Sequence, residues 1–70
     1  MPEHKEKYNR IKLVMVEKEM GVEELSRAIG KHPQSVIAYR NNIMQPTLKT
    51  LFAIAKALQV SPCELLAIPS

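Results

Sequence analysis

Cysteine, glycine and aromatic residues are scarce in this 70-residue chain, which has one cysteine, two glycines and no tryptophan. A single cysteine, Cys63, excludes an internal disulfide and argues against structural zinc, because such sites take several Cys and His ligands at set spacings. No apolar run approaches the roughly 20 residues of a membrane span, and the N-terminal segment is unlike a signal peptide. We therefore expect a cytoplasmic protein with no cofactor, metal or membrane partner.

Residue arrangements typical of catalysis are also missing. His4, His32 and Cys63 share no spacing that would suggest a metal or a nucleophilic site. The chain has no Gly-rich phosphate loop, no paired carboxylates and no serine–histidine arrangement. We do not expect an enzyme.

Acidic residues are absent from a long central segment. Between residues 25 and 63 the chain carries five bases and no acid, whereas residues 1–24 carry five bases and six acids. A continuous basic segment suits a polyanion, since neutralising phosphates supplies much of the affinity of a protein for DNA. A solvated basic surface explains the same charges, so charge alone does not decide between these readings.

Hydrophobic spacing predicts an all-α chain, because no segment alternates like a strand. Helices are expected over about 5–20, 22–29 and 33–40, then from a Thr47 cap and from a Ser61 capping box. Gly30 suits a left-handed helix end, and Pro33 suits the first position of a helix. The length allows one small domain, which we expect at 8–67 between a frayed N-terminus (1–7) and a tail (68–70). Several apolar residues are expected to face inward: Tyr8, Ala28, Leu48, Phe52 and Leu66.

The second and third predicted helices, joined by a short turn containing Gly30, have the pattern of a helix-turn-helix. The chain resembles the Cro/phage-repressor (XRE) type of DNA-binding domain in the segments MGVEELSRAIG, KHPQSVIAYRNN and QPTLKTLFAIAKALQVSPCELL. The resemblance covers about residues 8–66 and implies a compact, lambda-repressor-like bundle of five helices. It departs from the family at Gly21, where Ser or Thr is usual, at Ser26 for Ala, at Arg40 for Glu and at Asn42 for Gly.

The resemblance implies sequence-specific binding of double-stranded DNA by a small transcriptional regulator, expected to be a repressor of bacterial or phage origin. The helix from Pro33 would enter the major groove. Gln34 can pair with N6 and N7 of adenine, and the other expected base-reading residues are Ser35, Ile37 and Ala38. The expected phosphate contacts are Gly21, Val22, Lys31, His32, Arg40, Asn41, Asn42 and Lys49.

A homodimer on an inverted repeat is expected, because one such module contacts only a few base pairs. The candidate dimer residues are Ile43, Met44, Leu66 and Ile68. The alternative is a protein–protein module of the same fold, an antitoxin or an adaptor, whose DNA binding is secondary or lost. The uncharged Gln34 and Ile37 face keeps that alternative open.

Overall fold

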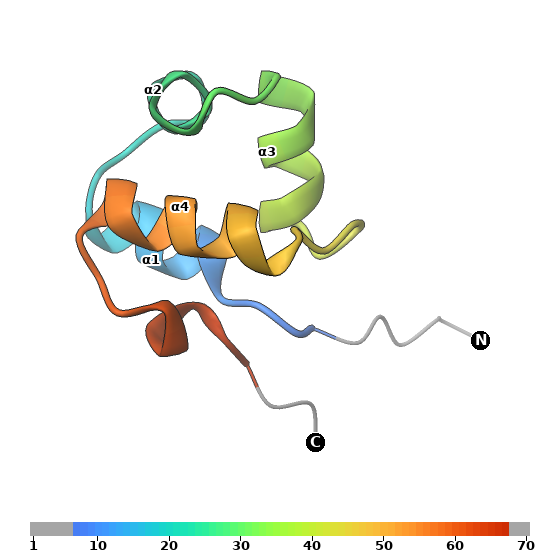
Figure 1. Ribbon diagram of the computed structural model, residues 1–70, viewed down its shortest axis with the longest axis vertical. Coiled ribbons are helices and arrows are strands. Elements are labelled where there is room, and N and C mark those ends of the chain that lie inside the picture. Colours follow the sequence, from blue (N-terminus) through green and yellow to red (C-terminus); the bar gives the residue numbers. More distant parts are fainter. Residues whose placement is uncertain (1–6, 68–70) are drawn as a thin grey trace.

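The computed structural model describes residues 7–67, which form four α-helices and a final 3₁₀ turn (Figure 1). The all-α class is confirmed, but the last element is not a fifth α-helix: its Glu64 N–H donates to the Ser61 carbonyl oxygen at 2.9 Å, three residues back. The Glu64 carboxylate accepts from the Ser61 N–H at 3.4 Å, which closes this turn. The elements are α1 (Ile11–Glu17), α2 (Val22–Ile29), α3 (Pro33–Arg40), α4 (Leu48–Leu58) and η1 (Pro62–Leu65).

Helix α4 is the centre of the packing, with α2 on one side of it and η1 on the other (Figure 1). Helix α1 contacts α3 and η1. Each fully buried aliphatic side chain contributes about 1.5–3 kcal/mol of favourable free energy to folding. The buried hydrophobic residues are Ile11, Val14, Met15, Leu25, Val36, Tyr39, Leu51, Ile54, Ala55, Leu58 and Leu65.

The first helix begins at Ile11, so the prediction that it extends through residues 7–10 is wrong. The residues before it are extended and pair with the C-terminal segment: the Arg10 N–H donates to the Leu65 carbonyl oxygen at 2.7 Å, and the Ala67 N–H donates to that of Tyr8 at 2.9 Å. This pairing occupies backbone groups that a helix would need. Tyr8 is consequently 49% exposed rather than turned into the core.

Four residues predicted to face inward lie at the surface instead. Phe52 is 55% exposed because it lies about 100° around α4 from the buried Leu51. Leu48 is 70% exposed because it precedes the first buried turn of the helix. Ala28 and Leu66 are exposed as well. The surface of α4 is thus more apolar than its periodicity suggested.

The connection between α2 and α3 has the geometry expected from the sequence. Gly30 adopts φ 70° and ψ 34°, the left-handed conformation, and the next N–H, that of Lys31, donates to the Ser26 carbonyl oxygen at 3.0 Å. This bond closes the helix end in the manner of a Schellman motif. The turn fixes α3 across α2, which is seen end-on in Figure 1 while α3 stands upright.

Candidate functional site

The outward face of α3 consists of residues at helical spacing. Gln34 and Asn41 are exposed, and Ile37 and Ala38 between them are half-buried. Positions i, i+3, i+4 and i+7 share one side of a helix, so these four residues form one stripe. Ser35 lies to the side of the stripe and is half-buried.

The beginning of α3 is fixed by a side chain that the sequence analysis assigned to phosphate contact. The Nδ1 atom of His32 accepts from the Gln34 N–H at 3.1 Å, so His32 is the N-cap of α3. This bond satisfies one of the N–H groups that a helix start leaves without an intrahelical partner. The ring must carry no proton on Nδ1 while it caps, which leaves Nε2 to donate outward in the neutral form. Capping and outward donation are compatible roles.

Other predicted phosphate-contacting residues belong to the segments before α2 and α3 and to the start of α4. Lys31 precedes α3, and Lys49 lies in the first turn of α4; both are exposed. At the start of α2, Gly21 provides no side-chain cap, so no side chain competes with an anion there. Glu23 and Glu24 in the same turn are exposed and bring negative charge to this helix start.

Asn42 is used inside the fold. Its Oδ1 accepts from the N–H groups of Tyr8 and Asn9 at 3.0 and 3.1 Å and from Nε2 of Gln45 at 3.1 Å. Its Nδ2 donates to the Asn9 carbonyl oxygen at 3.1 Å. The Asn42 side chain therefore joins the end of α3 to the segment before α1. Its phosphate contact stays a prediction that would have to leave these bonds in place.

The exposed apolar residues after α3 have a well-defined backbone. The N–H groups of Ile43 and Met44 both donate to the Ala38 carbonyl oxygen, at 2.9 and 3.2 Å. The side chains are 65% and 47% exposed. Of the other two predicted dimer residues, Leu66 is 51% exposed, and Ile68 lies outside the described residues.

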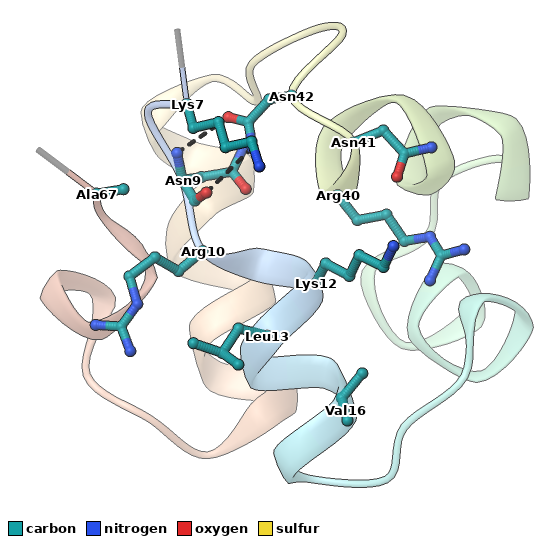
Figure 2. Close-up of a pocket in the computed structure, with 10 residues that line it drawn as sticks. All are labelled: Lys7, Asn9, Arg10, Lys12, Leu13, Val16, Arg40, Asn41, Asn42 and Ala67. Carbon is teal, nitrogen blue, oxygen red and sulfur yellow. Dashed lines mark hydrogen bonds between the residues drawn. The ribbon is translucent and has the colours of Figure 1, made fainter. Parts of the chain in front are cut away.

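A second group of basic residues was missed by sequence reasoning. Lys7, Arg10 and Lys12 line a pocket together with Arg40 from the end of α3 (Figure 2). The charge count over residues 1–24 did not reveal this group, because the acidic residues of that segment offset its positive charge. The signal was local: residues 7–12 hold three bases and no acid.

The described part of the chain has no group of three or more His, Cys, Asp and Glu residues that could hold a metal ion. Within residues 7–67, no helix has the length and apolar character needed to cross a membrane. The side chains on and beside the α3 stripe are hydrogen-bonding amides, small apolar groups and cations.

Comparison with known proteins agrees with this geometry. The sequence model of one family, described as "Helix-turn-helix", matches residues 11–65. The fold is similar to the crystal structure of "a putative DNA-binding protein from Bacteroides fragilis", with a TM-score of 0.83 and 33% identity over 86% of this chain and 97% of that one. No curated protein matches the chain.

Proposed function

Because the chain belongs to the helix-turn-helix family, we propose that it reads a specific sequence of double-stranded DNA with α3 and acts as a transcriptional repressor. The observation that carries this proposal is the outward stripe of α3, whose first residue, Gln34, is exposed next to a helix start capped by His32. An amide at that position can form two hydrogen bonds with adenine in the major groove. Ile37 and Ala38 offer methyl groups to thymine.

Cations around this stripe would hold the duplex backbone. Lys31 and Lys49 are exposed, and no acidic residue occurs from 25 to 63 to oppose them. Phosphate contacts of this kind position a protein on the duplex, whereas base contacts specify the sequence. The proposed place of action is the bacterial cytoplasm, where such DNA lies, and no catalytic step is involved.

We further propose that two copies bind an inverted repeat. The exposed apolar side chains Ile43, Met44, Leu48 and Phe52 lie on the loop after α3 and on the first turns of α4. Apolar side chains exposed on neighbouring segments are unfavourable in water, and where they form one patch that patch is typical of a protein interface. A second copy is the occupant that also explains DNA recognition, because a two-fold axis would present two α3 helices to half-sites one helical turn apart.

The test is a selection of binding sites from randomised duplex DNA, read by sequencing, at low and at physiological salt. We expect a short inverted repeat whose affinity falls steeply as salt increases. The matched control is the Gln34→Glu variant, which keeps the length of the side chain but replaces the amide with a carboxylate; it should lose the preference for adenine at one base pair of each half-site. Absence of enrichment by the unaltered protein at low salt would contradict DNA reading. A partner protein, sought by pull-down, would then be the better explanation of the uncharged α3 stripe.

A further inference from the structure

Helix α1, the segment before it and the end of α3 line an open pocket of about 510 Å³, which none of the four predicted base-reading residues lines (Figure 2). Small-molecule sites in proteins have volumes of roughly 300–1,000 Å³. Four bases and no acid line this pocket: Lys7, Arg10, Lys12 and Arg40. Like charges gathered without a counter-charge raise the free energy of the folded protein, and a bound anion would lower it.

Arg40 is the residue that most clearly lacks a partner. Its Nε is buried, and no hydrogen-bond acceptor among residues 7–67 reaches it. A buried donor left unpaired costs about 1–3 kcal/mol, more for a charged group. The Lys12 side chain extends toward the same guanidinium in Figure 2. The two cations therefore flank a position that suits an anionic group.

The floor of the pocket is apolar. Leu13 and Val16 lie one turn apart on α1 and are 48% and 66% exposed, so both offer apolar surface to a ligand. In Figure 2 Val16 lies below the Lys12 and Arg40 side chains, and Leu13 lies between Val16 and Arg10. A ligand that covered both residues would need an apolar body as well as a charged head.

The position of Arg40 on its helix directs its side chain away from that of Gln34, the first residue of the stripe. Six residues further along an α-helix, a side chain points about 120° away. Gln34, Ile37 and Ala38 do not line the pocket, and the stripe reaches it only at its last residue, Asn41. Exposed Leu13 and Val16 are also unsuited to a phosphate backbone, which offers charged oxygens and no apolar surface.

We propose that this pocket binds an organic anion with an apolar body, an aryl or alkyl phosphate or carboxylate, whose charged group lies between Lys12 and Arg40 and whose body covers Leu13 and Val16. Such a ligand would join α1 to the last residue of α3. The binding itself does not depend on the proposed DNA reading.

The experiment is a titration of the ¹⁵N-labelled full chain with phenyl phosphate, followed by two-dimensional NMR, with inorganic phosphate and phenol as separate probes. We expect saturable shifts at the amides of Lys12, Leu13, Val16 and Arg40 with phenyl phosphate, and much weaker ones with either half alone. A lack of saturation, or equal shifts with inorganic phosphate, would overturn the proposal in favour of unspecific ion pairing.

Three variants test whether the binding of phenyl phosphate depends on the charges of this pocket. Lys12→Met and Arg40→Met keep the aliphatic stems and remove the charges, and each should weaken phenyl phosphate binding at least about tenfold, the loss expected for one charged hydrogen bond. Lys56→Met removes an exposed charge of α4 that does not line the pocket and should leave binding unchanged. An equal loss in Lys56→Met would overturn the proposal.

Thermal unfolding supplies a readout of folding. Arg40→Met should unfold at the same or a higher temperature than the unaltered protein, because it removes a buried donor without a partner.

Duplex DNA is the competing ligand for this pocket. If Lys12→Met weakens the binding of duplex DNA as strongly as Lys31→Ala does, and DNA shifts the same amides, the pocket is part of the nucleic-acid surface and the small-ligand assignment is wrong.

Discussion

Asn9 and Asn42, which are 33 residues apart, hydrogen-bond to each other in both directions at 3.1 Å. Asn9 is only 5% exposed, and its own Nδ2 donates to the Tyr39 carbonyl oxygen and to Oε1 of Gln45. Its Oδ1 accepts from the Ile11 N–H at 3.0 Å. This pair therefore joins the start of α1, the end of α3 and the following loop.

Asn42 also has φ 57°, a left-handed conformation that costs most residues about 1–2 kcal/mol. We expect Asn42→Gly to lose the side-chain hydrogen bonds without gaining backbone strain. Asn42→Ala should lose the same bonds and also gain strain, so the Ala variant should be less stable than the Gly variant by about 1 kcal/mol. Chemical denaturation of the three proteins measures the difference. Equal stability of the two variants would show that the backbone conformation contributes nothing.

The two glycines should respond in opposite directions. A Cβ on either would meet no atom within 4 Å, so crowding plays no part. Gly30 has φ 70°, and Gly30→Ala should reduce the free energy of unfolding by about 1 kcal/mol. Gly21 is the N-cap of α2 in an extended conformation, and Gly21→Ser should add about 0.5 kcal/mol by capping an N–H. Denaturant unfolding decides both, and destabilisation by Gly21→Ser would contradict the second.

The hydrogen bond by which His32 caps α3 predicts the order of stability of variants at position 32. His32→Ala removes the acceptor for the Gln34 N–H and should destabilise the protein by about 1 kcal/mol, whereas His32→Asn should retain most of the stability. Amide hydrogen exchange at Gln34 and Ser35 would localise the effect to the start of α3. Equal protection in all three proteins would mean that the imidazole bond contributes nothing to this helix start.

Gln34→Ala should reduce affinity for the selected DNA by about 1–3 kcal/mol and relax preference at one base pair. Its control is Lys31→Ala, which should weaken binding to all sequences alike and lower the salt slope by about one. Titrations at several salt concentrations on selected and scrambled duplexes separate the two effects. An unchanged preference in Gln34→Ala would remove Gln34 from the base-reading set.

Phe52→Glu should disrupt the proposed dimer and leave the fold intact, because Phe52 is 55% exposed. The control, Lys18→Glu, introduces a negative charge at an exposed residue at the end of α1 instead. Sedimentation of both variants with and without the inverted repeat measures the oligomer, and circular dichroism checks the helices. A monomer at all concentrations in the unaltered protein, bound singly to DNA, would contradict the dimer.

The sequence predicted local features well and long-range pairings poorly. Helices α2 and α3 have the predicted bounds because Gly30 and Pro33 act through their own backbone conformations. The start of α1 was wrong because Tyr8 and Arg10 bond to residues near the other end of the domain, which no periodicity reveals. Phe52 was misplaced because a nearly continuous apolar run does not state which side of the helix meets the core.

The same limit applies to the candidate site. The resemblance to the Cro/phage-repressor type implied that Gln34, Ile37 and Ala38 lie on the outward side of one helix, and that implication needs no knowledge of the tertiary structure. The capping role of His32 depends on the ring reaching Gln34, and the pocket of Lys12 and Arg40 depends on how α1 lies against α3. Such contacts exist only once the helices are packed.

The pairing of residues 8–10 with residues 65–67 closes a loop that includes nearly the whole domain. The entropy lost in closing a loop grows with its length, so these bonds should be among the last to form as the chain folds, after α2, α3 and α4 have packed. They should also be among the first to open in the native state, since Tyr8 and Leu66 are half exposed. Because Asn9 belongs to this pairing and to the end of α3, early opening would loosen the recognition helix at its C-terminal end while its capped start stays ordered.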